Sequence, residues 1–303
     1  MSSISVVTGA FGYTGRYIAQ RLLDSGATVR TLTRNPATAS PFGDRVERHP
    51  LDFDNPGRLT ESLRGAATLY NTYWIRFARG PVNHDTAVHN TRHLIDAAVA
   101  AGVRRIVHVS ITSADAASPL PYFRGKGLVE EHIRNSGLAH SIIRPTVIFG
   151  RQDILINNIA WFLRRFPVFP VAGRGDYPLQ PVYVDDVARL GVESAAAECN
   201  MTIDAVGPET FTFRELLEEV RRITGGRARL LHAPPSLTYA AASLMGLLLR
   251  DVVLTRDEID GLMAGRLVSA DPPTGTTQLT DWMRQHRDTL GRRYASELAR
   301  HYG

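Results

Sequence analysis

The sequence has 303 residues, of which 44% are hydrophobic and 21% are charged, and its formal net charge is +5. This composition is typical of a globular protein with one large core or two lobes. Cys199 is the only cysteine, which excludes an intrachain disulfide and favours a reducing compartment. The amino terminus runs directly into an apolar strand pattern, so we expect no signal peptide and predict a cytoplasmic location.

The arginines are scattered along the chain and form no block interleaved with aromatic residues, which argues against nucleic acid binding. The most apolar stretch, Leu237 to Leu249, is too short to span a bilayer. We interpret it as a buried helix, with a surface for a lipophilic substrate or a membrane as the alternative. The expected partner is a small-molecule substrate, with peripheral membrane contact left open. We expect a monomer or a homodimer.

The first half of the chain alternates strand-like and helix-like segments. The expected strands are Ile4–Thr8, Thr28–Thr33, Val46–Pro50, Ala67–Thr72, Arg105–Ser110 and His140–Ile143. The expected helices are Thr14–Ser25, a short one starting at Asn55-Pro56, Asp85–Ala101 and Tyr122–Ser136. This rhythm predicts an α/β fold, a doubly wound parallel Rossmann sheet with helices on both faces.

After Gly150 the alternation breaks, and proline-rich Phe166–Pro170 is unsuited to a central strand. Asp185–Glu198 is expected to be a helix and Met201–Val206 a strand, while capping patterns at Thr212 and Thr255 predict further helices. We therefore expect a dinucleotide-binding domain over residues 1–150, with 178–210 returning to it. A smaller, mainly helical substrate lobe would comprise 151–177 and 211–303.

A glycine-rich turn, Thr8 to Gly15, lies between the first expected strand and the first expected helix. Gly9 permits the tight turn, Gly12 lets the backbone approach a pyrophosphate, and Gly15 lets the helix pack on the strand. In this position the pattern is strong evidence for dinucleotide binding. The residues predicted to contact the cofactor here are Gly9, Phe11, Gly12, Tyr13 and Gly15.

The second expected strand ends in Thr33-Arg34, where proteins that bind NAD usually carry an acid for the ribose 2′-hydroxyl. Arg34 could instead bind a 2′-phosphate, so NADP(H) is favoured and NAD(H) stays open. Asp52-Phe53 follows the third strand and is expected beside the adenine. Asp52 could accept a hydrogen bond from the amine or cap a helix.

The sequence contains 35 lysine and arginine residues, and only Lys126 is a lysine. Tyr122 precedes it by four residues, so both lie on one face of the expected helix. A tyrosine has an ordinary pKa of about 10, and a nearby ammonium favours the phenolate. The pair could exchange a proton with a substrate oxygen while hydride moves to or from nicotinamide.

With these motifs the chain resembles the extended and atypical short-chain dehydrogenase/reductase superfamily. Within it the chain is most similar to the NmrA-like and complex I accessory-subunit-like branch, also described as NAD(P)-dependent epimerase/dehydratase-like. The resemblance covers roughly Ser3 to Phe213. The supporting segments are the glycine turn, Tyr122-x-x-x-Lys126, Arg144–Gly150 and Gln180–Ala188.

The resemblance implies roles for further residues. Thr112 would hold the substrate oxygen, with Ser110 as a second candidate, and Asn90 would steady the active-site backbone or a water. Tyr73, Pro145 and Val147 would line the cofactor cleft, and Lys126 would also hold the nicotinamide ribose.

Bulky residues lie where the family builds its substrate pocket. We expect Asn157, Trp161 and Tyr183 to contact substrate, and the apolar neighbours favour a lipophilic carbonyl or enone. His89 and His93 are four residues apart, but no further ligands accompany them, so no metal is expected.

These observations predict an NADP(H)-dependent oxidoreductase of the extended short-chain type. One alternative is an NAD-dependent sugar-nucleotide epimerase or dehydratase. The other is a non-catalytic NAD(P)H-binding structural or sensor protein, whose known relatives often lack the tyrosine–lysine pair.

Overall fold

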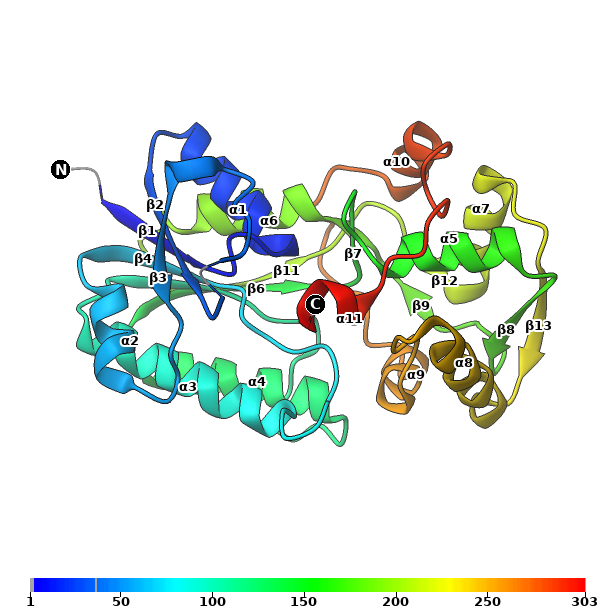
Figure 1. Cartoon of the computed structure of the whole chain (residues 1–303), viewed down its shortest axis with the longest axis horizontal. Helices are drawn as coiled ribbons and strands as arrows, with labels where there is room; N and C mark the ends of the chain where they lie inside the picture. Colours follow the sequence, from blue (N-terminus) through cyan, green and yellow to red (C-terminus); the bar gives the residue numbers. More distant parts are fainter. Residues whose placement is uncertain (1–2, 36, 303) are drawn as a thin grey trace. The chain divides into compact units, whose positions relative to one another are not determined.

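The computed structural model describes residues 3–35 and 37–302 and divides the chain into two compact units (Figure 1). The first unit comprises residues up to Pro145 together with Val184–Ala205, and the second comprises Thr146–Tyr183 with the residues from Val206 onward. Residues 146–150, 178–183 and 206–210, which the sequence assigned to the dinucleotide-binding domain, therefore lie in the second unit.

A seven-stranded parallel sheet forms the centre of the first unit. Its strand order is β11-β6-β5-β4-β1-β2-β3. The strands are β1 (Ile4–Thr8), β2 (Thr28–Thr33), β3 (Val46–Pro50), β4 (Ala66–Asn71), β5 (Arg105–Val109), β6 (Ala139–Pro145) and β11 (Met201–Ala205). The order reverses between β1 and β4, and ligands of doubly wound sheets bind at the carboxyl ends of strands at such a point.

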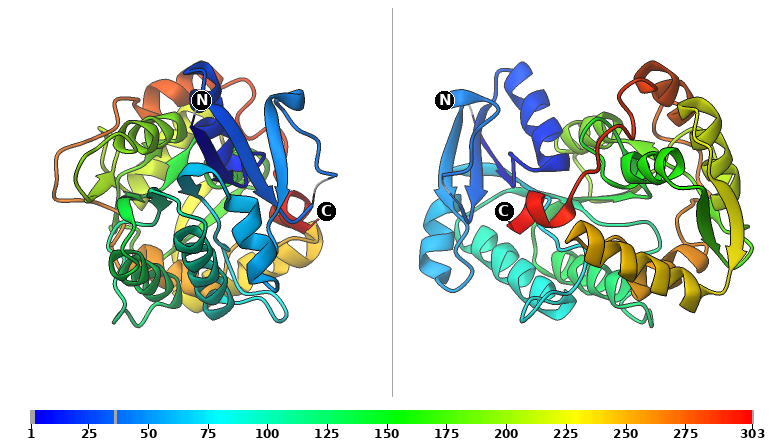
Figure 2. Two further views of the ribbon diagram at one scale, coloured as in Figure 1. Left: turned by 90° about the vertical axis from the view of Figure 1, so that its left-hand side faces the viewer. Right: turned by 45° about the vertical axis from the view of Figure 1, so that its right-hand side comes forward.

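Helices cover both faces of this sheet, as the predicted fold requires (Figures 1 and 2). On one face, α1 (Tyr13–Asp24) packs against α6 (Val184–Ser194). On the other face lie α2 (Pro56–Leu63), α3 (His84–Ala100) and α4 (Pro121–Asn135), packed in that order. The predicted doubly wound Rossmann architecture is confirmed.

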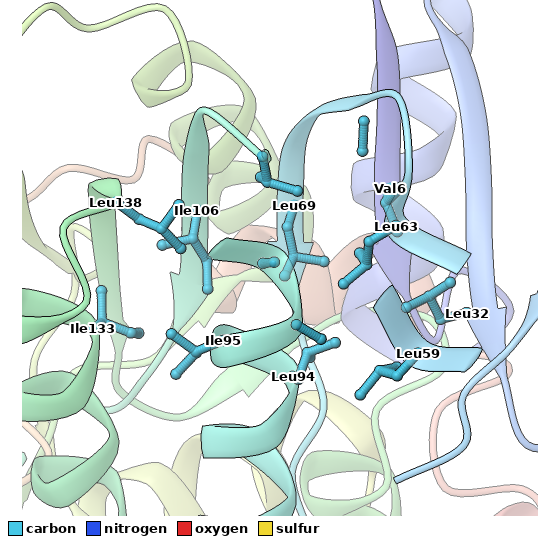
Figure 3. Packing of buried hydrophobic residues seen from close by; sticks show 14 of the residues in the cluster. Val6, Leu32, Leu59, Leu63, Leu69, Leu94, Ile95, Ile106, Ile133 and Leu138 are labelled. Carbon is cyan, nitrogen blue, oxygen red and sulfur yellow. The ribbon is translucent and has the colours of Figure 1, made fainter. Parts of the chain in front are cut away.

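The hydrophobic core lies between the sheet and the α2–α4 layer (Figure 3). Leu69 and Ile106 project from the central strands, while Leu94 and Ile95 of α3 meet them, and all four are fully buried. Burial of one such side chain contributes roughly 1.5–3 kcal/mol. This packing fixes the strand ends that carry the candidate site.

The second unit is mainly helical with three small two-stranded sheets. Its helices are α5 (Leu155–Arg165), α7 (Phe213–Thr224), α8 (Pro235–Leu249), α9 (Arg256–Met263), α10 (Leu279–His286) and α11 (Glu297–Tyr302). Its strands are β7 (Ile148–Phe149), β8 (Val168–Ala172), β9 (Pro178–Leu179), β10 (Val182–Tyr183), β12 (Phe211–Thr212) and β13 (Arg229–Ala233). The proline-rich segment forms β8, which pairs only with β13, as expected for a strand that cannot be central.

The apolar stretch Leu237–Leu249 is helical, but the prediction that it is buried is wrong. Only Thr238 and Gly246 of α8 are buried, whereas Leu247 is 78% exposed and Leu248 71%. At the end of the helix the chain folds back on Gly246, where a Cβ would lie 2.7 Å from the Asp251 carbonyl oxygen. Hydrophobic composition alone therefore did not indicate which side chains the fold covers. Among the described residues, no helix combines the length and apolarity needed to cross a membrane.

Candidate functional site

The glycine turn connects β1 to α1 and is shaped for close backbone approach. Gly9 has a φ of +66°, and its carbonyl oxygen accepts a 2.8 Å hydrogen bond from the Gly12 amide. A Cβ on Gly15 would lie 2.3 Å from that same oxygen. Gly12 caps α1 without a side-chain hydrogen bond, and the first turn of the helix contains no acidic residue. The amide groups at this helix end therefore suit the pyrophosphate of a dinucleotide.

Substitution of Gly15 by alanine is expected to destabilise the protein and abolish NADPH binding. The new methyl group would collide with backbone atoms, which cannot rotate away, so we expect a loss of about 2–3 kcal/mol or more. Chemical denaturation and NADPH titration would measure both effects. Gly57→Ala is the matched control because its nearest atom, Asn55 Oδ1, lies 3.6 Å away. Unimpaired NADPH binding in Gly15→Ala would contradict the assignment of this turn.

The predicted adenosine-side residues lie at the carboxyl ends of β2 and β3. Thr33 exchanges local hydrogen bonds with Asn35, and Arg34 is exposed. The Asp52 carboxylate forms an ion pair with the Arg58 guanidinium, at 3.3 Å between Oδ2 and Nη1. Arg48 of β3, which the sequence did not indicate, lies with its guanidinium 5.4 Å from the centre of the Phe11 ring. Two exposed cations thus lie on these two strands, Arg34 just after β2 and Arg48 within β3.

A buried polar network ties the ends of β1, β4 and β5 together. The Asn71 side-chain oxygen accepts hydrogen bonds from the Thr8 hydroxyl and the Tyr73 amide. Its side-chain nitrogen therefore donates to Nδ1 of His108, at 3.0 Å. Burial and then the nearby Lys126 ammonium hold the pKa of His108 well below its ordinary value, so the ring is neutral. The remaining proton lies on Nε2, a buried atom without a hydrogen-bond partner.

Tyr73 and Asn90, two of the residues implied by the family resemblance, contact each other. The Asn90 amide donates a 2.9 Å hydrogen bond to the Tyr73 hydroxyl. The Tyr73 ring packs on Phe53 at 4.7 Å between centroids. The predicted residues Phe53, Tyr73 and Asn90 thus form one continuous group at the ends of β3, β4 and on α3.

Lys126 lies inside the first unit and is only 2% exposed. Its Nζ donates a 2.8 Å hydrogen bond to the Val109 carbonyl at the end of β5 and lies 4.4 Å from the centre of the Trp74 ring. Burial lowers the pKa of Lys126 to about 7, while Glu130 acts in the opposite direction. The amine is therefore able to gain or lose a proton near neutral pH.

Two glycines flank Lys126 and explain how it comes to lie there. A Cβ on Gly127 would lie 2.2 Å from the Ala116 amide nitrogen, and one on Gly125 would lie 3.0 Å from the Trp74 ring. Glycine weakens a helix by roughly 1 kcal/mol. Here it lets the loop after β5 and the Trp74 ring approach α4 on both sides of the lysine, and α4 continues unbroken to Asn135.

Tyr122 lies one turn before Lys126 in an aromatic environment. Its ring makes edge contacts with His84 at 5.6 Å and Trp74 at 6.0 Å between centroids. Trp74 therefore contacts both members of the predicted pair. The buried Trp74 Nε1 has no hydrogen-bond partner in the structure. Such an unsatisfied donor is expected to meet a water or a ligand.

The candidates for holding substrate oxygen differ in their hydrogen bonds. The Ser110 hydroxyl donates to buried Glu130 at 2.6 Å, and Glu130 also binds Arg144 and Arg134. Thr112 is 2% exposed and donates a weaker 3.2 Å hydrogen bond to the Arg144 carbonyl. Ser110 thus belongs to a structural ion-pair cluster, while the Thr112 hydroxyl is less firmly bound.

Two of the predicted cofactor residues lie on either side of the division between the units. Pro145 ends β6 in the first unit, while Val147 lies in the second unit and its carbonyl accepts from the Val182 amide. Their proposed contact with the cofactor stays a prediction.

The predicted substrate residues Asn157, Trp161 and Tyr183 lie in or at the edge of the second unit. Asn157 bridges backbone groups of Arg293 and Gly291. Trp161 belongs to an aromatic cluster that includes Tyr294 at 5.2 Å, and Tyr183 packs on Phe149 at 5.5 Å. Their substrate role stays a prediction.

His89 and His93 contact each other through their rings, and Nδ1 of His93 bonds the Phe53 carbonyl. Across residues 3–35 and 37–302, no group of three or more histidine, cysteine, aspartate or glutamate side chains is arranged to hold a metal ion.

Sequence reasoning missed four residues that shape this region. Trp74, Glu130 and His108 are partners of Lys126 or Ser110 from distant parts of the chain, and Arg48 faces the glycine turn. One signal was available, because Trp74 directly follows Tyr73 at the end of a strand that we had singled out. Glu130 also lies four residues after Lys126.

Comparison with known proteins shows which proteins the chain resembles. Residues 9–153 match a family model described as NAD(P)H-binding. The match covers the glycine turn and most of the first unit, so the predicted resemblance to NAD(P)H-binding proteins is confirmed at that level.

The chain is similar to both complex I subunits and reductases. It is 26% identical to the mitochondrial NADH dehydrogenase (ubiquinone) 1 alpha subcomplex subunit 9 of Arabidopsis thaliana, over 88% of this chain and 71% of that protein. It is 27% identical to a ceramide reductase of Caulobacter vibrioides, over 79% and 76%. Its fold matches an NADPH-dependent quinone oxidoreductase of Escherichia coli solved with NADPH, with a TM-score of 0.75, 22% identity and coverage of 93% and 99%.

Proposed function

We propose that this protein is an NADP(H)-dependent oxidoreductase that reduces a lipophilic carbonyl compound or enone, or oxidises the corresponding alcohol. The observation that carries the proposal is the environment of the chain's single lysine. Lys126 is buried at the carboxyl end of β5, and the same Trp74 ring contacts it and Tyr122. Burial of a cation is costly, and buried ionisable groups with shifted pKa values cluster at functional sites.

In this proposal Tyr122 is the proton donor to the substrate oxygen. A protonated Lys126 nearby favours the phenolate that remains, which makes proton release easier. Thr112 orients the substrate oxygen through its hydroxyl, and we assign this role to Thr112 because Glu130 engages the Ser110 hydroxyl. When bound, NADPH supplies the hydride to the carbonyl carbon.

The dinucleotide would be held mainly by backbone groups. The amides after Gly9 and at the start of α1 suit the pyrophosphate, and the Lys126 amine would hold the nicotinamide ribose. Preference for NADP(H) over NAD(H) is supported by the exposed guanidinium groups of Arg34 and Arg48 and by the lack of an acid at the end of β2. A phosphate binds guanidinium through paired, charge-assisted hydrogen bonds.

Removal of both cations, Arg34→Ala with Arg48→Ala, is expected to weaken NADPH binding at least tenfold and to leave NADH binding within about threefold, because only NADPH carries the 2′-phosphate. Fluorescence titration of both nucleotides would measure this. Arg104→Ala is the control, because Arg104 is exposed and precedes β5, at the amino ends of the strands and away from the carboxyl ends of β2 and β3. An equal loss for both nucleotides would remove these residues from 2′-phosphate recognition.

The lipophilic substrate class is supported by the surroundings of Tyr122, whose ring meets Trp74, His84 and Phe123. Such a site lacks the amide and carboxylate partners that a nucleotide sugar needs. The names of the similar proteins include ceramide and quinone, both lipophilic. NADPH oxidation assayed against long-chain ketones, quinones and UDP-glucose would test the proposal, and a response to UDP-glucose alone would overturn it.

A non-catalytic NADPH-binding role is the second candidate, because complex I subunits are among the relatives. Such a protein would bind NADPH without oxidising it in the presence of any carbonyl tested.

For either function we propose a reducing compartment, the cytoplasm, from the single exposed cysteine.

A further inference from the structure

An open cavity of about 390 Å³ lies within the second unit. None of the predicted catalytic or cofactor-binding residues lines it, but Trp161, which the sequence predicted to contact substrate, does. Its lining contains four arginines and no acidic residue. The lining residues are Trp161, Arg164, Arg165, Gly225, Arg227, Gly291 and Arg292. Four like charges at one cavity repel each other, and an anion bound there would relieve that repulsion.

Three segments that are distant in the sequence are joined by hydrogen bonds and build this cavity. The turn after α7 bonds the end of α5, where the Leu163 carbonyl accepts from the amides of Arg227 and Ala228. The turn after α10 bonds α5 through Arg164, whose guanidinium donates to the Leu290 and Arg287 carbonyls. The cavity therefore has a preformed wall.

Glycines allow these segments to meet. A Cβ on Gly226 would lie 2.9 Å from the Leu163 carbonyl oxygen, and one on Gly291 would lie 2.6 Å from Ala160. Gly291 also has a φ of +69°, and its amide donates to the Asn157 side chain. The segments that line the cavity are thus tightly packed against one another.

Two of the arginines have structural reasons to be present, and two do not. Arg164 and Arg165 lie in the last turn of α5, where cations interact favourably with the helix end. Arg227 lies in a turn, is exposed and lines the cavity without a carboxylate. The Arg292 guanidinium donates through Nε to the carbonyl of Asp288, in the loop that follows α10. Burial, and then repulsion from Arg292, lower the pKa of Arg164, in agreement with a surplus of positive charge.

We propose that this cavity binds a phosphate ester whose phosphate group is held by the arginines and whose organic part packs on Trp161. Guanidinium groups match the several oxygens of a phosphate. The volume exceeds that needed by a phosphate alone and lies in the range of small-molecule sites. The Trp161 ring, which already lies 5.8 Å from the Arg165 guanidinium, offers an aromatic surface beside the charge. The ligand is a free phosphate ester or the headgroup of an anionic lipid.

The first test is calorimetric titration of the full-length protein with phenyl phosphate, in saturating NADPH so that phosphate binding at the glycine turn is blocked. We expect binding with a Kd of about 1 mM or tighter. The variant Arg165→Gln with Arg227→Gln should weaken it at least tenfold, because both guanidinium groups line the cavity and neither joins α5 to the turn after α10, as that of Arg164 does. Arg174→Gln is the control, since Arg174 is exposed, pairs with Asp176 and does not line the cavity.

Vesicle flotation distinguishes the two sources of phosphate. Vesicles of phosphatidylcholine with phosphatidic acid should bind the wild-type protein and release the double variant if a lipid headgroup is the ligand. Binding of phenyl phosphate without vesicle binding identifies a free ester. If neither probe binds, or if the double variant binds both as tightly as wild type, the proposal is overturned. An unchanged melting temperature shows that the variant is folded.

Discussion

The variant Tyr122→Phe is expected to lose NADPH-dependent carbonyl reduction by about 10³-fold while its Kd for NADPH changes by less than about threefold. A general acid contributes typically 10²–10⁴-fold, and the substitution removes only the proton donor. The aromatic ring that contacts Trp74 and His84 is kept, so the fold around α4 should persist. Stopped-flow measurement of NADPH oxidation and fluorescence titration give the two values.

Tyr239→Phe is the matched control for this experiment. Tyr239 lies on α8 in the second unit, and a phenyl ring would keep its contact with the Arg256 guanidinium. Its turnover should equal that of the wild type. Full turnover in Tyr122→Phe would remove Tyr122 from the mechanism and leave the NAD(P)H-binding domain unaffected.

The variant Lys126→Met should lose at least about 10²-fold in turnover and gain stability at pH 6. Burial lowers the pKa of Lys126 to about 7 in the folded protein, against 10.5 as its ordinary value. Below pH 7 the amine is protonated in both states, so the folded protein carries the full cost of a buried cation. Methionine has similar length and no charge, and it removes that cost.

The pH dependence of this stability difference has a defined sign. Between pH 7 and about 10 the folded protein releases the proton while the unfolded chain keeps it. The wild type therefore gains stability relative to Lys126→Met by up to about 1.4 kcal/mol per pH unit. Urea denaturation of both proteins at pH 6 and pH 9 measures the difference. If Lys126→Met is less stable than the wild type by the same amount at both pH values, the Lys126 amine stabilises the fold and its pKa is not lowered by burial.

Local sequence patterns were enough to predict the sheet and the dinucleotide turn. The strand preceding Gly9 is a short apolar run, and the three glycines have the spacing typical of a dinucleotide-binding turn, so residues close in the sequence determine the result. The same holds for the position of Tyr122 and Lys126 on one helix face, because residues four apart are neighbours in any α-helix.

Contacts between distant residues could not be predicted in this way. The burial of Lys126 depends on Trp74 and on the Val109 carbonyl, which come from other strand ends. The cluster around Glu130 joins Ser110 and Arg144 across two strands. No periodic pattern in the sequence encodes such pairings.

The apolar helix α8 shows that hydrophobic composition alone does not predict burial. Its composition predicted burial, but whether a leucine such as Leu247 is covered depends on which elements pack beside it. Roughly half of a protein surface is apolar in any case, so hydrophobicity alone is a weak guide to burial at a single helix.

Transfer of deuterium from NADPH labelled at C4 of the nicotinamide tests the proposed function most directly. The protein, labelled NADPH and a panel of quinones, long-chain ketones and enones are incubated together, and the products are analysed by mass spectrometry. The proposal predicts one deuterium in a reduced product with wild-type protein and almost none with Tyr122→Phe. Tight NADPH binding with no labelled product from any compound would contradict it and favour a structural or sensing role.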